Sequence, residues 1–401
     1  VGSRATATGY GALAKGWLSL ASGNYSIAEG ASSNASGQYA QARGYNAGAS
    51  GNYSQAMGSF TKSTALHAVA IGYGDSANSP YSVALGYTCK SAGSYSVAMG
   101  HLSKTYAASA VALGYTDTAS GQFASAFGAL SKATSSYAIT LGTYCEASGY
   151  GSIAQGWRST ASGNYSAAFG HSATASGAYA TGMGYLSIAS GDYAITLGRS
   201  DTASGTTSTA IGYGSNASGN YSHVIGSYGT TAGYTGAMIL GDVSSSTRVT
   251  STVNNQLTSR FAGGYRLFSN QWMSTGVRLA SGGTSWSSIS DRRAKENIKE
   301  TEYGLAEVLR LKPSQYQYIG NDYENIGFIA QEVQEIIPEI VDVPQDTNEF
   351  MSVRYTEMIP VLTKAIQELS AQNQEMAELL AKQQEELNGL KAQMETSMTS
   401  E

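Results

Sequence analysis

The first 240 residues carry a hydrophobic and polar pattern that repeats every 14 positions. A repeat nearly always has a small residue two positions before its glycine and often a large apolar residue one position before it, as in SVALG (82–86) and SVAMG (96–100). Small and large side chains thus alternate with the period of 2 that is typical of a strand. The glycines in phase are Gly2, Gly16, Gly30, Gly44, Gly58, Gly72, Gly86, Gly100, Gly114, Gly128, Gly142, Gly156, Gly170, Gly184, Gly198, Gly212 and Gly226. A period this short excludes helical repeats and predicts one turn of a parallel β-solenoid per repeat.

The alternation predicts that each coil has two faces. We expect one face to fill the narrow interior, and the alanine-bearing face to allow the close approach of a neighbouring subunit. The glycine is expected where the chain turns with φ > 0 or packs tightly. With about 4.8 Å per coil, the array predicts a rod of roughly 77 Å. Because the repeat is already in phase at Gly2 and an uncapped solenoid exposes an edge strand, we expect further protein before Val1.

Aromatic residues and cysteines also follow the repeat. Tyrosines gather five positions before and one position after the phase glycine. Stacking between coils is the favoured explanation, and platforms for a sugar or receptor are the alternative. Cys89 and Cys145 share a column four coils apart, about 19 Å, so two free thiols are expected. The four histidines lie in scattered coils without partners at ligand spacing, so no metal site is expected.

Beyond residue 241 the pattern changes twice. Residues 242–289 alternate polar and apolar positions around Gly-Gly pairs, which predicts short strands. Farther on, spacings of 3 and 4 alternate and predict a coiled coil over about 360–396. Its seam is Ile366, Leu369, Asn373, Met376, Leu380, Gln383, Leu387, Leu390 and Met394. We expect Asn373 and Gln383 to fix the register of this seam; a lone amphipathic helix is the alternative.

Charge divides the chain at the same place. Residues 1–289 hold 13 Lys/Arg and 7 Asp/Glu, a net charge of +6, whereas residues 290–401 hold 10 and 21, a net charge of −11. The basic residues are spread along the first part, so no nucleic-acid surface is expected. No run approaches 18 continuous apolar residues, so no membrane span is expected. No motif in the sequence calls for a cofactor.

The repeat units SVALG (82–86), SVAMG (96–100), SAVALG (109–114) and SAAFG (166–170) resemble the head repeat of trimeric autotransporter adhesins of the YadA type, whose units read S-x-A-x-G. The resemblance covers residues 1–241. It implies left-handed parallel β-rolls that pack as a homotrimer.

Four stretches in the C-terminal part resemble the intramolecular chaperone of endosialidase, the self-cleaving C-terminal domain of phage tail spikes and fibres. They are SDRRAKENI (290–298), LKPSQYQY (311–318), GFIAQEVQEIIPEIV (327–341) and VRYTEMIPVLTKAIQEL (353–369). The expected fold is therefore mainly β: a β-roll of 14-residue coils in a trimer (1–241), a β-rich neck (242–289), and an α+β chaperone domain that ends in the coiled coil (290–401).

The resemblance also assigns roles within SDRRAKENI. It implies that Ser290 is a nucleophile and Lys295 its general base, with Asp291, Arg293 and Asn297 supporting the site. Such a base must be a neutral amine, a form that burial or the nearby Arg292 and Arg293 would favour. Cleavage is expected at Ile289–Ser290 or at Ser290–Asp291. Without the resemblance, a Ser-Asp pair before charged residues predicts only a helix N-cap.

The sequence leaves three functions open. The favoured one is a trimeric phage tail fibre on the virion, which binds a polysaccharide or outer-membrane component of the host and carries a self-cleaving chaperone. A bacterial surface adhesin with the same chaperone is the alternative. A polysaccharide depolymerase is least favoured, because it needs paired carboxylates in a groove. The carboxylates of the repeat are scattered over separate coils: Glu29, Asp75, Asp117, Glu146, Asp192 and Asp201.

Overall fold

The computed structural model describes residues 4–398, so the first phase glycine, Gly2, lies outside the described residues. The chain forms two compact units, and the boundary falls between Ser288 and Ile289. Each unit is described by itself.

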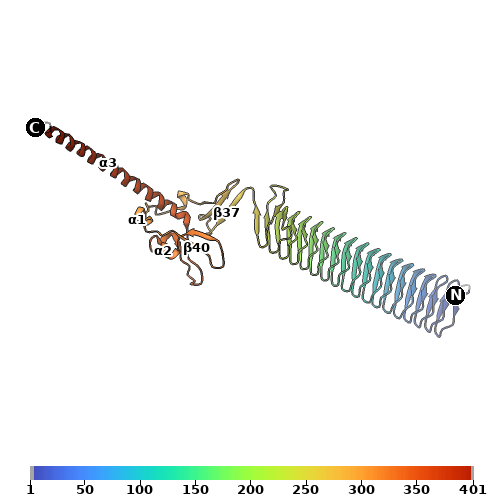
Figure 1. Ribbon diagram of the computed structural model, residues 1–401. Helices are drawn as coiled ribbons and strands as arrows, with labels where there is room; N and C mark the ends of the chain where they lie inside the picture. The colour runs from blue at the N-terminus through green and yellow to red at the C-terminus, as the bar shows by residue number, and fades with distance from the viewer. Residues whose placement is uncertain (1–3, 399–401) are drawn as a thin grey trace. The chain divides into compact units, whose positions relative to one another are not determined.

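Unit 1 is a parallel β-solenoid with one longer and one shorter strand in each coil (Figure 1). The longer strands are β2 (Leu13–Lys15), β4 (Ile27–Glu29), β6 (Gln41–Tyr45), β8 (Gln55–Ser59), β10 (Val69–Tyr73), β12 (Val83–Tyr87), β14 (Val97–His101), β16 (Val111–Tyr115), β18 (Ser125–Ala129), β20 (Ile139–Thr143), β22 (Ile153–Trp157), β24 (Ala167–His171), β26 (Thr181–Tyr185), β28 (Ile195–Arg199), β30 (Thr209–Tyr213), β32 (His223–Ser227), β34 (Met238–Gly241) and β36 (Leu257–Arg260). The shorter strands are β1 (Thr6–Ala7), β3 (Leu20–Ala21), β5 (Asn34–Ala35), β7 (Gly48–Ala49), β9 (Lys62–Ser63), β11 (Ser76–Ala77), β13 (Lys90–Ser91), β15 (Lys104–Thr105), β17 (Thr118–Ala119), β19 (Lys132–Ala133), β21 (Glu146–Ala147), β23 (Thr160–Ala161), β25 (Thr174–Ala175), β27 (Ile188–Ala189), β29 (Thr202–Ala203), β31 (Asn216–Ala217), β33 (Gly229–Thr230) and β35 (Val249–Thr250).

From β1 to β32, each strand of the solenoid pairs with the strand 14 residues away, so the register of pairing equals the period of the sequence. Each longer strand pairs in parallel with the equivalent strand of the next coil, so that Val83 lies opposite Val97 and Gly86 opposite Gly100. The shorter strands pair in the same way, with Lys90 opposite Lys104. Like residues therefore stack on like residues along the rod, and the predicted 14-residue coil is confirmed.

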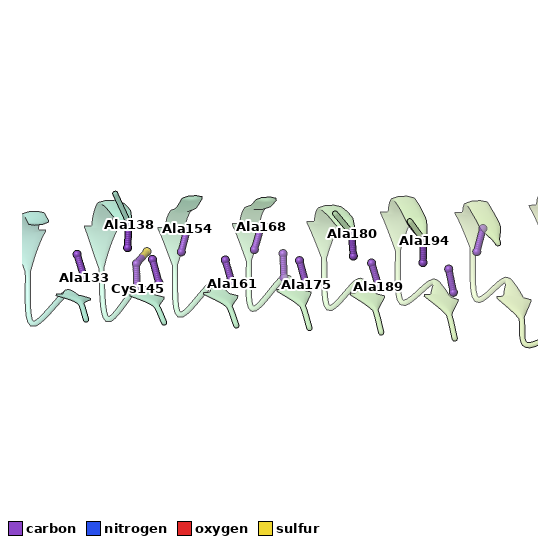
Figure 2. Packing of buried hydrophobic residues seen from close by; sticks show 14 of the residues in the cluster. Ala133, Ala138, Cys145, Ala154, Ala161, Ala168, Ala175, Ala180, Ala189 and Ala194 are labelled. Carbon is purple, nitrogen blue, oxygen red and sulfur yellow. The ribbon is translucent and has the colours of Figure 1, made fainter. Parts of the chain in front are cut away.

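The alanine columns line the interior of each coil. Ala84 and Ala98 are fully buried, whereas Met99 on the neighbouring position is 38% exposed. Figure 2 shows such side chains from the two rows of strands pointing toward one another across the interior. The expectation that the alanine face meets a neighbouring subunit is therefore wrong. The space between the two strands of a coil is narrow and holds mostly small side chains, so most of the large ones point outward from the longer strand.

The phase glycines are required by the close stacking of coils. Gly86 has φ +134°, and a Cβ at this position would collide with the carbonyl oxygen of Gly100 on the next coil. Most coils also carry two non-glycine residues in the left-handed region, such as Thr88 (φ 55°) and Tyr95 (φ 61°), at their two turns. For a bulky residue this conformation is strained, so the stacked coils impose it.

Coil pairing continues past residue 241, although the 14-residue period ends there. Gly241 pairs with Gly226, 15 residues earlier, and Arg260 in turn pairs with Gly241. The Arg260 guanidinium forms an ion pair with Asp242 (3.1 Å) and donates to the Thr247 carbonyl, which closes the enlarged turn. The rest of the neck (242–289) contains an antiparallel sheet of β37 (Gly264–Phe268), β38 (Gly276–Ala280) and β39 (Ser287–Ser288).

Unit 2 is a small α+β domain that ends in a long helix (Figure 1). Its elements are η1 (Arg292–Ala294), α1 (Leu305–Val308), β40 (Ser314–Gln317), β41 (Glu324–Gly327), α2 (Ala330–Gln334), η2 (Pro338–Ile340), β42 (Val341–Asp342), β43 (Ser352–Val353), η3 (Tyr355–Glu357) and α3 (Met358–Met398). The core joins Val333, Ile337 and Ile340 around α2 to Met358 and Val361 at the start of α3. Glu368 on α3 accepts a hydrogen bond from the Leu305 N–H (2.7 Å), which ties α1 to the helix.

Candidate functional site

The SDRRAKENI stretch folds as a single 3-10 turn at the beginning of unit 2. Asp291 caps η1, because its carboxylate accepts a hydrogen bond from the backbone N–H of Arg293 (2.8 Å). A helix N-cap is therefore present, as the general reading of a Ser-Asp pair predicts, and Asp291 supplies it. The Ser290 side chain is left available for another partner.

That partner is Lys295. The turn of η1 brings position 295 back to position 290, and the Lys295 Nζ lies 2.8 Å from the Ser290 Oγ. After the turn the backbone of Lys295 is extended, and its N–H donates to the Arg292 carbonyl oxygen. The structure thus joins the two residues of the expected dyad by a hydrogen bond, which is the contact that a nucleophile and its base need.

Asp291 and Arg293 stabilise the turn that holds this pair. The Arg293 guanidinium lies 2.7 Å from the Asp291 carboxylate. The hydrogen bonds from the side chain and then the backbone of Arg293 hold the pKa of Asp291 below its usual range. Asn297 follows in the left-handed region, with φ 54°. Within residues 4–398, no hydrogen bond links Asn297 to Ser290 or Lys295, so its expected supporting role has no described contact here.

Both residues of the dyad are exposed in a single chain, while Ile289, which precedes the serine, is half-buried. A serine hydroxyl in contact with an amine can attack a neighbouring carbonyl carbon, provided that the amine is neutral. The described residues of a single chain do not cover the dyad. Groups outside these residues would therefore be needed to exclude water from the site.

The heptad seam of α3 is a continuous exposed surface. Asn373 and Gln383 lie along it as predicted, and both are exposed. The apolar seam residues are exposed by 45% or more: Ile366, Leu369, Met376, Leu380, Leu387, Leu390 and Met394. The packed part of the helix is its first two turns, where Met358, Val361 and Ala365 are buried. A 41-residue helix with an apolar stripe of this length is typical of a coiled-coil strand.

The tyrosine columns form stacked ladders, as the favoured explanation predicts. Tyr81 lies between His67 and Tyr95, with ring centroids 5.1 and 4.9 Å away and nearly parallel planes. Arg199 takes one place in the second ladder, within 5.6 Å of the rings of Tyr185 and Tyr213. Three of the four histidines, His67, His101 and His171, are members of these ladders. Within residues 4–398, no group of three potential ligands could hold a metal ion.

Three carboxylates of the repeat lie inside the coils, which sequence reasoning missed. Asp75, Asp117 and Asp201 are fully buried. Burial raises the pKa of each carboxyl, and that of Asp201 to about 6. They stand three positions after a phase glycine, a column otherwise filled by small residues, which is the signal that could have located them. Cys89 and Cys145 occupy the same column as two buried free thiols, as predicted.

Two comparisons with known families agree with these features. The model described as YadA head domain repeat matches residues 7–33, 49–74, 63–88, 91–116, 119–144, 147–173, 175–199 and 203–228. The model described as chaperone of endosialidase matches residues 290–342, which begin with Ser290 and contain the dyad. No curated protein matches the chain. Within the described residues, no helix is long and apolar enough to cross a membrane. The chain therefore carries YadA head repeats, followed by a segment that is similar to the chaperone of endosialidase.

Proposed function

We propose that this chain is a homotrimeric phage tail fibre whose C-terminal unit aligns three chains, assists folding of the β-rod and then releases itself by cleavage at Ser290. The observation that carries the proposal is the 2.8 Å contact between the Ser290 Oγ and the Lys295 Nζ. This contact lies two residues beyond the end of unit 1, where a cut would separate the two compact units.

The reaction follows from these atoms. The Lys295 amine takes the proton of the Ser290 hydroxyl, whose oxygen attacks the carbonyl carbon of Ile289. The C–N bond breaks, the released Ser290 amine receives the proton, and water hydrolyses the resulting ester. A cut between Ser290 and Asp291 is the alternative. Mass spectrometry of the C-terminal fragment separates the two, because it begins at Ser290 in one case and at Asp291 in the other.

Trimerisation is supported by apolar surface that a single chain leaves open in both units. Unit 1 exposes the large apolar column of its longer strands, with Leu141 37% and Leu197 47% exposed. Unit 2 exposes Phe350 (95%) and Ile326 (78%) besides the α3 seam. Exposed apolar surface of this extent marks a protein interface. Association through α3 would bring three rods into register and raise their effective concentration, which helps a fold of slow, non-local strand pairing.

The first test is a denaturing gel of the wild type and matched variants. We expect a C-terminal fragment in the wild type and in Lys299→Met, which removes a lysine that pairs with Glu302 and lies outside the dyad. Ser290→Ala and Lys295→Met are expected to leave the chain intact. Equal fragment yields from all four proteins would remove the cleavage proposal.

The second test links cleavage to assembly. Leu380→Asp together with Leu387→Asp places charges in the α3 seam, far along the helix from the core of unit 2. We expect a monomer by sedimentation and a cleavage rate lowered by about tenfold or more, since the exposed dyad then stays in water. A monomer that cleaves at the full rate would contradict the trimer requirement.

A bacterial surface adhesin with the same chaperone is the second candidate, and the match to YadA head repeats favours it. Mass spectrometry of purified phage particles and of the bacterial surface fraction distinguishes the two. A tail fibre is recovered with the virions, whereas an adhesin is recovered with the cells.

A further inference from the structure

The solenoid lines up four lysines that are far apart in the sequence. Lys62, Lys90, Lys104 and Lys132 all stand four positions after a phase glycine, so the 14-residue coil places them in one column. This column is the outward position of the shorter strands β9, β13, β15 and β19. Their neighbours Ser63, Ser91, Thr105 and Ala133 point inward and are fully buried, whereas the lysines are exposed or half-buried. At about 4.8 Å per coil, the stripe is about 24 Å long.

The column holds no acidic residue from Lys62 to Lys132. Between residues 30 and 145 the sequence has only two carboxylates, Asp75 and Asp117, and both are buried inside the coil. Within residues 4–398, none of the four lysines forms an ion pair. Glu146 occupies the next place in the column, after Lys132, and ends the stripe. Basic residues that are far apart in the sequence thus form one stripe on this face.

The arrangement costs the solenoid stability. Lys90 and Lys104 pair in register on adjacent coils, and like charges directly opposite one another on paired strands repel. A surface selected for stability alone would alternate the signs of charge or use uncharged residues, as the same column does at Thr160 and Thr174. A bound polyanion would offset the repulsion.

We infer that the lysine stripe binds a linear anionic polysaccharide laid along the rod axis. The inference rests on the proposed adhesive function and names the class of receptor. Carboxylate, sulfate or phosphate groups of the polymer would meet the lysine amines. The two coils without a lysine in this column carry the hydroxyl residues Ser76 and Thr118 there, and these can bond sugar hydroxyls. Tyr106, exposed beside Lys90 with its ring 5.7 Å from the Nζ, offers a flat face to a sugar ring.

The stripe also stays accessible in the assembly proposed above. The large apolar side chains project from the longer strands, on the opposite side of the alanine-filled interior from the lysines. A trimer that buries the apolar columns would therefore leave three lysine stripes facing solvent. Three parallel stripes would bind a polymer surface with avidity.

The test uses the full chain and three fluorescent probes: polygalacturonate, heparin and neutral dextran. We expect the wild type to bind at least one anionic polymer more weakly as salt rises, and not to bind dextran. Lys90→Gln with Lys104→Gln should weaken this binding by about tenfold, since two ionic contacts are lost. The matched control, Arg158→Gln with Arg199→Gln, removes two positive charges from other columns and should bind as the wild type does.

Several outcomes would overturn the inference. They are equal losses in the two double variants, no binding of either anionic polymer, and tighter binding of duplex DNA than of any polysaccharide. Adhesion to host cells and C-terminal cleavage, measured on the same proteins, separate this inference from the proposed function. If the lysine variant adheres to host cells as the wild type does, the stripe is not the receptor site, although the protein remains an adhesin. If the wild type does not adhere, the adhesive function itself is contradicted.

Discussion

The two units of the chain build their interiors in opposite ways. The solenoid interior is filled mostly by alanine and other small side chains, and the next coil fixes each residue through backbone hydrogen bonds. Unit 2 packs a few large side chains from separate segments, among them Val333, Ile340 and Met358. The difference shows what determines the effect of a substitution in each unit. A solenoid residue is constrained by the backbone 14 positions away, whereas a residue of unit 2 is constrained by side-chain packing.

Alanine in place of glycine should give the largest contrast between the units. Gly114 has φ +142°, and a Cβ there would collide with the Gly128 carbonyl, so Gly114→Ala should destabilise the solenoid by roughly 2–6 kcal/mol. Gly389 lies in α3 with nothing near its missing Cβ, so Gly389→Ala should stabilise the helix by about 1 kcal/mol. Thermal unfolding of both variants checks the two signs. Equal effects would remove the claim that close coil stacking requires the phase glycines.

The polar seam positions give the next largest effect, confined to unit 2. Asn373→Leu with Gln383→Leu should strengthen helix association by about 2 kcal/mol per position and loosen the choice of chain number. Analytical ultracentrifugation is expected to show a mixture of oligomers. Gln374→Leu, off the seam, is the control and should keep the wild-type oligomer. A single unchanged oligomer in the double variant would show that these two residues do not set the register.

Buried carboxylates make the solenoid sensitive to pH. Burial raises the pKa of Asp201 to about 6. The ionised carboxylate therefore destabilises the fold fully above about pH 6, and below about pH 4 the effect is absent because the carboxyl is protonated in both the folded and the unfolded chain. Stability should therefore fall as the pH rises through this window. Asp201→Ser should raise stability at pH 7 by about 1–3 kcal/mol, with little change at pH 4. Melting curves of Asp201→Ser at pH 4 and pH 7 test this prediction, and Asp192→Ser, at an exposed position, is the control. A stability gain of equal size at the two pH values would contradict it.

The tyrosine ladder gives the smallest and most local effect. Tyr81 is stacked on both sides and has φ 58°. Tyr81→Ala loses the ring contacts and keeps the strain, so it should cost about 1–2 kcal/mol. Tyr81→Gly also loses the contacts but relieves about 1 kcal/mol of strain, so it should cost less. Chemical denaturation ranks the two variants, and a more stable alanine variant would show that the left-handed backbone is not strained here.

The sequence predicted the solenoid because each 14-residue repeat forms one coil, so the period of the sequence is also the register of strand pairing. Every phase glycine from Gly16 onward lies where stacking requires it. Which face each column takes could not be predicted, because alternation separates two sides of a strand without saying which is inside. The burial of Asp201 depends on the same choice of face, because its column, three positions after a phase glycine, points into the coil.

The candidate site shows the same limit on a smaller scale. The residues of SDRRAKENI predicted a capped turn, and the resemblance predicted the contact between Ser290 and Lys295. Neither predicted that Asp291 would be the cap or that the dyad would be exposed in a single chain, because exposure depends on what packs around the turn.

The in-register stacking of identical coils also makes the rod's length adjustable. Deleting one 14-residue repeat places each residue against the equivalent position of another coil, so the in-register strand pairing and the ends of the rod are preserved. Length can thus change in steps of about 4.8 Å without a new fold. For a fibre that must span a distance to its target, duplication or loss of whole repeats changes the reach while the means of attachment and assembly stay the same.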